Sequence, residues 1–334
     1  MATYKDIRDE TGLSLATISK FYNGGNVLPA NARAIEAAAE RLSFRPNAFA
    51  RNLRSRRTRS VGVLLPDLTS DFHLSILAGI ERRLRDHRVS MLICADHPHE
   101  EGLDEAVEFL AARMVDGIIA VPTERATPGL RNVAAQGMPI VTMDWPADGV
   151  VADEVVIDNE EAAAMAIQHL ADHGHRRIAL LGSDLAATLR SRERGVRRQL
   201  AARGIPVREE YISRTPMTVA AGRAAMQRML LLEERPTAVF CTNNMLGVGA
   251  LTALAESGLK VPDEMSFVGF DMPLLARMTS PSLAMVAQRV DLIAREAADL
   301  MLRRLEPEVA QSPQRKVVLH AEFLFGGSVA DIRS

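Results

Sequence analysis

Short apolar runs recur after residue 60 of this 334-residue chain, and longer amphipathic stretches separate them. The runs are apolar almost throughout, which is typical of strands that are buried on both faces of a parallel sheet. Seven strands are predicted in this way, at residues 61–65, 90–95, 117–121, 140–143, 178–181, 238–241 and 267–270.

The stretches between the apolar runs have the periodicity of amphipathic helices. They predict helices at residues 72–86, 105–113, 129–135, 160–173, 192–202, 220–232, 246–257 and 291–305. Alternation of strands and helices indicates an α/β fold with doubly wound parallel sheets. Eight such units suit two lobes better than one.

The charge is distributed unevenly along the chain. Residues 1–60 contain eleven Lys and Arg against five Asp and Glu, whereas the remainder contains 29 basic and 37 acidic residues. A basic N-terminal segment on an acidic body indicates that the segment meets a polyanion, and helical patterning in the same segment favours nucleic acid.

The first 42 residues have the pattern of a helix-turn-helix followed by a third helix. We predict helices over 4–10, 15–22 and 30–42, with Thr3 and Ser14 as N-caps and Gly12 closing the first helix. The side chains expected to pack the first two helices together are Ile7, Leu13, Ile18 and Phe21, and those expected to face outward are Leu15, Ala16, Thr17, Ser19 and Lys20.

The second helix of such a motif enters the major groove with its first turn. Leu15 and Ala16 could then contact thymine methyl groups, and Lys20 could reach guanine acceptors or a phosphate. The alternative is that Leu15 belongs to the core and that Lys20 is merely solvated.

A basic segment follows at residues 45–59, and it contains five arginines between Arg51 and Arg59. Pro46 suits the first position of a short helix, which we place at about residues 46–55. Leu53 is an apolar side chain in this basic run and could wedge between base steps in the minor groove. The alternative is a flexible basic linker.

Five segments of the chain resemble those of a known family. ATYKDIRDETGLSLATISKFYNG and RLSFRPNAFARNLRSRRTRSVGVLLPD resemble the start of lactose-repressor (LacI/GalR-type) regulators, and RPTAVFCTNNMLGVGAL, LKVPDEMSFVGFD and HGHRRIALLG resemble recurring segments of their core. The resemblance covers essentially the whole chain. It implies a small all-α helix-turn-helix head at 1–59 and an α/β core at 60–334, built from two doubly wound parallel-sheet lobes of periplasmic-binding-protein type.

By the same resemblance, the N-lobe comprises about 60–158 and 288–320, and the C-lobe about 159–287 and 321–334. The family function is sequence-specific repression of transcription by a homodimer on double-stranded palindromic operator DNA. A leucine-heptad tail is not evident, so a dimer is favoured over a tetramer. The predicted DNA-contacting residues are Thr3, Ser14, Leu15, Ala16, Thr17, Ser19, Lys20, Asn23, Asn47, Ala50, Arg51, Leu53 and Arg54. The family usually has Arg where this chain has Lys20, and lysine lacks the bidentate fork.

Polar residues follow several predicted strands, and ligands of such sheets bind beyond the carboxyl ends of strands. The resemblance places Asp144, Arg192, Asn243 and Asp271 at effector contacts of the sugar-responsive members, with Phe72, His73 and Trp145 lining the same cleft. The alternative for Asn243 and Asp271 is that they only cap the following helices.

The chain departs from the family pattern at Asn244 and Met272, where Asp is usual. These two departures weaken the assignment of individual effector contacts. Trp145 after Asp144 also occurs in the purine-responsive branch, so a nucleobase-responsive, co-repressed regulator remains an alternative, although Asn243 is of the sugar type.

Other classes of protein fit the sequence less well. Recognisable nucleophile, Walker A or dinucleotide motifs are missing, so an enzyme is not expected. His97, His99, His173 and His175 lack further ligands at metal-binding spacing, and we expect neither a metal nor a cofactor. A solute-binding protein would share the core fold, but we expect a cytoplasmic protein without membrane contact because the N-terminus does not resemble a signal peptide. A steep fall of DNA affinity with salt would identify a regulator.

Overall fold

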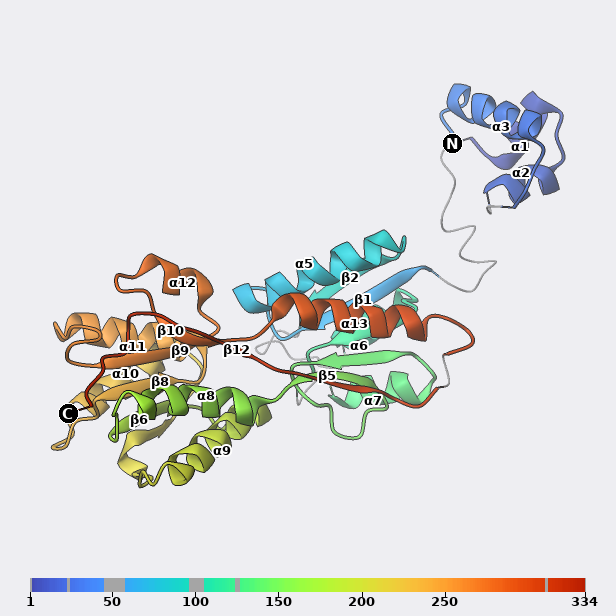
Figure 1. Cartoon of the computed structure of the whole chain (residues 1–334). Helices are drawn as coiled ribbons and strands as arrows, with labels where there is room; N and C mark the ends of the chain where they lie inside the picture. Colours follow the sequence, from blue (N-terminus) through green and yellow to red (C-terminus); the bar gives the residue numbers. More distant parts are fainter. Residues whose placement is uncertain are drawn as a thin grey trace. The chain divides into compact units, whose positions relative to one another are not determined.

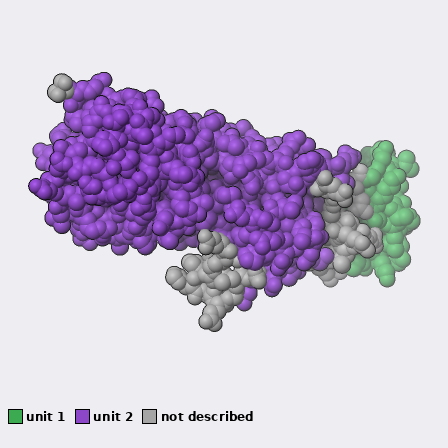
Figure 2. Space-filling model, turned by 90° about the horizontal axis from the view of Figure 1, so that it is seen from below, with its two compact units in different colours: residues 1–58 green, residues 59–334 purple. Residues whose placement is uncertain are grey.

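The computed structural model describes residues 2–22, 25–44, 58–95, 105–123, 127–309 and 312–333. The chain divides into two compact units, Met1–Thr58 and Arg59–Ser334, which are coloured separately in Figure 2.

The described residues of the first unit form three helices, α1 (Tyr4–Thr11), α2 (Leu15–Tyr22) and α3 (Pro29–Arg41) (Figure 1). Its core is formed by the fully buried side chains of Ile7, Ile18, Ile35 and Ala38, against which Leu13 and Phe21 pack. The predicted packing of the first two helices is therefore confirmed.

The helix ends of this unit follow the predicted capping. Thr3 and Asp6 form a capping box, in which the Thr3 N–H donates to the Asp6 carboxylate at 2.7 Å. Gly12 ends α1 in the left-handed region with φ 67°, a conformation that costs glycine little. The Thr17 N–H donates to Ser14 Oγ at 3.1 Å, so Ser14 caps α2.

The second unit contains two six-stranded sheets. The first has the order β11-β5-β4-β3-β1-β2, and every neighbouring pair is parallel. Its strands are β1 (Ser60–Leu65), β2 (Ser90–Ala95), β3 (Gly117–Ala120), β4 (Ile140–Met143), β5 (Asp153–Ile157) and β11 (Lys316–Leu319). One face is covered by α5 (Asp71–Asp86) and α13 (Val290–Arg304), which run side by side in Figure 1, and the other by α6 (Glu105–Ala112) and α7 (Thr127–Ala135).

The second sheet has the order β12-β10-β9-β8-β6-β7. Its strands are β6 (Ile178–Gly182), β7 (Ile212–Arg214), β8 (Ala238–Cys241), β9 (Ser266–Phe270), β10 (Ala284–Ala287) and β12 (Glu322–Leu324). Its two faces are covered by α8 (Asn159–Asp172) with α9 (Ala187–Ala202), and by α10 (Val219–Leu230) with α11 (Asn244–Glu256) and α12 (Pro273–Met278). The prediction of two doubly wound lobes is confirmed, although β12 is an antiparallel edge strand in a sheet expected to be wholly parallel.

Several elements were not predicted. Strands β5, β7, β10, β11 and β12 have only three to five residues each, and β5 begins with two acidic residues and alternates between buried and half-buried positions. Helix α9 begins five residues before the predicted start, and α12 was missed.

The chain passes between the two sheets three times, at Asp158, at Gln288–Arg289 and at residues 320–321.

A buried ion pair closes the first lobe at the amino end of β5. Arg304 and Asp153 are 7% and 2% exposed, and both guanidinium-to-carboxylate bonds measure 2.7 Å. Arg304 also donates to the carbonyl oxygens of Ser312 and Pro313, at 2.5 and 2.9 Å. The pair therefore ties the end of α13 to β5 and to the chain that leads into β11.

None of the helices in the described part of the chain combines the length and apolarity that a membrane crossing requires.

Candidate functional site

A cavity of about 240 Å³ lies between the two sheets, at the carboxyl ends of their strands. Both lobes contribute to it, and Gln288 lies on one of the crossing segments. All seven side chains predicted for an effector line this one cavity, namely Phe72, His73, Asp144, Trp145, Arg192, Asn243 and Asp271. The other lining residues, which were not among the seven predicted contacts, are Pro66, Asp67, Ser70, Thr188, Leu189, Met217, Asn244, Met245, Phe270 and Gln288.

Asp144 is the first residue after β4 and is only 8% exposed. Its φ of 64° lies in the left-handed region, which a non-glycine residue adopts at a cost. Its Oδ1 atom is buried and has no hydrogen-bond partner among the residues that the structure describes. Burial raises the pKa of Asp144, against the opposing attraction of Arg192 and His73. The cavity is thus lined by a buried acceptor that receives no hydrogen bond from the described protein groups.

Arg192 is held on three sides. Its Nε donates to Asn159 Oδ1 at 2.7 Å, and its Nη1 donates to the Thr242 carbonyl oxygen at 2.6 Å. Its Cζ lies 3.6 Å from the centroid of the Phe270 ring, a cation–π contact. Burial lowers the pKa of Arg192, and the nearby Asp271 and Asp144 oppose that effect. The guanidinium plane is fixed before any ligand arrives.

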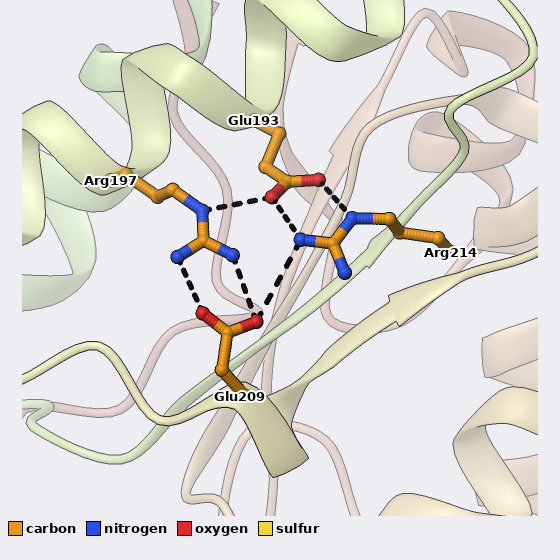
Figure 3. Close-up of polar contacts among 4 residues, drawn as sticks. All are labelled: Glu193, Arg197, Glu209 and Arg214. Atoms are coloured by element: carbon orange, nitrogen blue, oxygen red, sulfur yellow. Dashed lines mark hydrogen bonds and ion pairs between the residues drawn. The ribbon is translucent and has the colours of Figure 1, made fainter.

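The helix that carries Arg192 is itself held tightly. Gly195 lets α9 approach α8, because a Cβ added there would lie 2.1 Å from the carbonyl oxygen of Glu160. Further along α9, Glu193 and Arg197 join Glu209 and Arg214 in a network of ion pairs (Figure 3). Glu193 accepts from Arg197 Nε at 2.8 Å and from Arg214 Nε at 2.9 Å. This network anchors α9 to β7 and to the turn before it.

Asp271 is the first residue after β9, and both its oxygens are engaged by one residue. The backbone N–H of Gln288 donates to Oδ1 at 2.7 Å, and its side-chain Nε2 donates to Oδ2 at 2.6 Å. Gln288 Oε1 is buried, and within the described ranges it has no hydrogen-bond partner. The capping alternative for Asp271 is wrong, because α12 has no side-chain cap and begins after Met272. Gln288 was missed because β10, the strand before it, was not predicted.

Asn243 caps α11, as the alternative proposed. Its Oδ1 accepts from the backbone N–H groups of Met245 and Leu246, at 2.9 and 3.4 Å. Asn243 also lines the cavity, so the cap fixes its side chain at the edge of the site. On the opposite lobe, His73 Nδ1 is buried, has no hydrogen-bond partner among the described side chains and backbone groups, and lies 3.8 Å from Asp67 Oδ2.

In the first unit, the residues predicted to read DNA differ in exposure and in structural role. Leu15, Ala16 and Lys20 are exposed on α2, and Leu15 lies outside the buried core, contrary to the alternative that placed it there. Thr17 and Ser19 are half-buried. Thr3 and Ser14 act as helix caps. The predicted Asn23, Asn47, Ala50, Arg51, Leu53 and Arg54, and the hinge helix over 46–55, lie outside the described residues, as do His97 and His99.

No group of three or more His, Cys, Asp or Glu side chains is placed to hold a metal ion within the ranges that the structure describes.

Known proteins resemble this chain over nearly its whole length. A family model for a periplasmic binding protein-like domain matches residues 167–329. The HTH-type transcriptional repressor PurR of Actinobacillus pleuropneumoniae serotype 3 is 28% identical over 99% of both chains. A solved complex of the transcriptional regulator CelR with cellobiose is 26% identical, with a TM-score of 0.74 over 98% of this chain and 100% of that one.

The lac repressor dimer bound to operator and the anti-inducer ONPF is 24% identical and shows the same fold, with a TM-score of 0.86 over 98% of this chain and 99% of that one. The head with its exposed second helix, the two-lobed core and these similarities lead to one assignment. They support a transcriptional regulator of the lactose-repressor (LacI/GalR-type) family.

Proposed function

We propose that this regulator binds a palindromic operator as a homodimer, and that a small sugar bound between the core lobes controls its affinity for DNA. The observation that carries the proposal is the convergence on one cavity of three charged side chains from both lobes, the buried Asp144 and Arg192 and the half-buried Asp271.

The DNA-binding part rests on the exposed face of α2. Leu15 and Ala16 present apolar groups that suit thymine methyls, and Lys20 presents a cation at the other end of the same helix. The capping by Ser14 orients the first turn of α2, which is the part of a recognition helix that meets base edges. The excess of basic residues in the first 60 positions supplies attraction to phosphates.

The effector part rests on the chemistry of the cavity. Carboxylate and guanidinium groups bond pairs of neighbouring hydroxyls, and the indole of Trp145 offers a surface for the apolar face of a sugar ring. The regulator solved with cellobiose has the same fold over the full chain.

The position of the cavity couples ligand binding to the arrangement of the two lobes. A ligand that bonds Asp144 in one lobe and Asp271 in the other favours a closed arrangement of the lobes, and Gln288 on a crossing segment touches the same site. The ligand shifts the population between two states only by its different affinity for them.

A nucleobase effector is the second candidate. Trp145 directly after Asp144 favours it, since an indole stacks equally well on a flat heterocycle, and relatives named PurR are 28% identical to this chain. A thermal-shift screen that includes sugars and purines separates the two, because a true ligand stabilises the fold by mass action.

The DNA-binding proposal is tested by selecting duplexes from a random library with the full chain at moderate ionic strength. We expect a palindromic sequence to be enriched and to bind more tightly than its scrambled counterpart, with an affinity that falls steeply with salt. Failure to enrich any palindrome would contradict the proposal.

A further inference from the structure

We propose that the cavity accepts an uncharged or amine-bearing polyol of about monosaccharide size and excludes ligands that carry a carboxylate or phosphate. The inference rests on the proposed function, because it assumes that the cavity holds the effector, and it defines the chemical class of that effector.

Two hydrogen-bond acceptors at this cavity receive no hydrogen bond from the described part of the protein. Asp144 Oδ1 and Gln288 Oε1 are both buried, and no group in the described part of the chain donates a hydrogen bond to either. The orientation of the Gln288 amide is fixed by its Nε2 bond to Asp271, so the free oxygen can only accept. Unmet buried acceptors are costly, and a ligand relieves the cost only if it brings donors. Hydroxyl and ammonium groups donate, whereas ionised carboxylates and phosphates do not.

The charges that line the cavity are predominantly negative. Asp67, Asp144 and Asp271 supply three carboxylates, and Arg192 is the single Lys or Arg among the described lining residues. Asp144 and Arg192 are 8% and 5% exposed, so their fields are weakly screened. An anionic ligand would be repelled by the buried Asp144 and by the half-buried Asp271, and juxtaposed like charges are a common means of rejecting wrong ligands.

Arg192 is poorly available to offset that repulsion. The two-point contact that carboxylates and phosphates make with arginine through Nε is closed, because Nε already donates to Asn159. Nη1 donates to the Thr242 carbonyl, and Phe270 stacks against the guanidinium face. Arg192 is therefore built into the wall of the site and offers a ligand only its remaining N–H groups.

The size of the cavity limits the ligand further. About 240 Å³ is below the roughly 300–1,000 Å³ that is common for sites of drug-sized ligands. Trp145 and Phe72 supply apolar surface beside the acidic groups. A single sugar ring, with one apolar face and a rim of hydroxyls, matches this combination.

The test compares ligands that share a skeleton and differ in charge. For glucose, galactose and ribose, the neutral sugar, an amino derivative, the sugar acid and the terminal phosphate are each titrated into the full chain by calorimetry, after a thermal-shift screen. We expect binding by neutral or amino members of at least one set, with the acid and phosphate of that set weaker by at least about tenfold, a difference of 1.4 kcal/mol.

The variant Asp144→Asn should reduce this discrimination at least about threefold relative to the wild type, because it removes a buried negative charge without changing the shape of the side chain. Asp148→Asn, at an exposed carboxylate outside the cavity, is the matched control and should leave the discrimination unchanged.

An acid or phosphate that binds as tightly as its neutral parent would overturn the inference, and so would the absence of binding by every neutral and amino sugar. Selection of a palindromic duplex by the same preparation separates these failures from a failure of the regulatory function itself.

Discussion

Asp144 and Asp271 occupy equivalent positions in the two lobes. Each is the first residue after the third strand from the same edge of its sheet, with φ of 64° and 52°. Each also donates its backbone N–H to the neighbouring strand, to the carbonyl oxygens of Val155 and Val286 at 3.0 and 2.9 Å. The repeated topology thus brings one carboxylate from each lobe to the same cavity, where Asp144 contributes to raising the pKa of Asp271.

Replacing Asp144 by asparagine should stabilise the ligand-free protein. Burial raises the pKa of Asp144 in the folded state above its usual value of 3.8, so the ionised carboxylate opposes folding at neutral pH. We expect Asp144→Asn to raise Tm at pH 7.5 by a few degrees, corresponding to roughly 1 kcal/mol. The gain should shrink as the pH falls and the wild-type carboxyl becomes protonated. An equal or lower Tm at pH 7.5, measured beside Asp148→Asn, would count against this account.

Breaking the buried pair in the first lobe should destabilise the core. Arg304→Met leaves Asp153 buried and unpaired, and the loss should be about 3–5 kcal/mol in the free energy of unfolding by urea. The double variant with Asp153→Leu should recover much of that loss, since no charge is then stranded. Equal stabilities of the single and double variants would show that the pair is not the cause.

Lys20→Ala should weaken operator binding. If Lys20 contacts a phosphate, affinity falls for all duplexes and the slope of log K against log salt decreases by about 1. If Lys20 reads guanine, the loss is about 1–3 kcal/mol and is confined to the selected sequence. Lys260→Ala, an exposed lysine of the core, is the control of equal charge. Unchanged affinity and salt slope for Lys20→Ala would remove this residue from the interface.

His169 should make the fold sensitive to mild acid. Burial, followed by the proximity of His173, lowers the pKa of His169 to about 4, and the ring packs 4.6 Å from that of Phe323. The neutral ring is favoured in the folded state, so its contribution to stability is complete above about pH 6.5 and is lost as the pH falls towards 4. Between pH 7 and 5, His169→Gln should lose less stability in urea than the wild type, and the exposed-site variant His87→Gln should lose the same amount as the wild type. Parallel losses in all three proteins would exclude this role.

Sequence reasoning was most successful where local patterns decide the structure. Continuous apolar runs identified the central strands, and Thr3, Gly12 and Ser14 marked helix ends correctly because capping is local chemistry. It failed where contacts between residues far apart in the sequence decide the structure. The short strand β10 has four residues, and its place beside β9 in the second sheet depends on pairing that no local pattern reveals.

The same limit applied to the cavity. The aspartates were identified because they follow strongly apolar strands, and the family resemblance supported them. Gln288 and Asn159 were missed, because their importance lies in bonds to Asp271 and Arg192, which are 17 and 33 residues away in the chain. Partners of this kind can be identified only from the folded structure.

The account depends most on coupling between the cavity and the DNA-binding head. The direct measurement is the Kd of the full chain for its selected palindromic duplex, by fluorescence anisotropy, with and without a saturating concentration of the polyol that binds the cavity. We predict a change of about 5–150-fold in the wild type, with the duplex altering polyol affinity by the same factor. Identical operator affinity in the presence and absence of bound polyol would contradict the account.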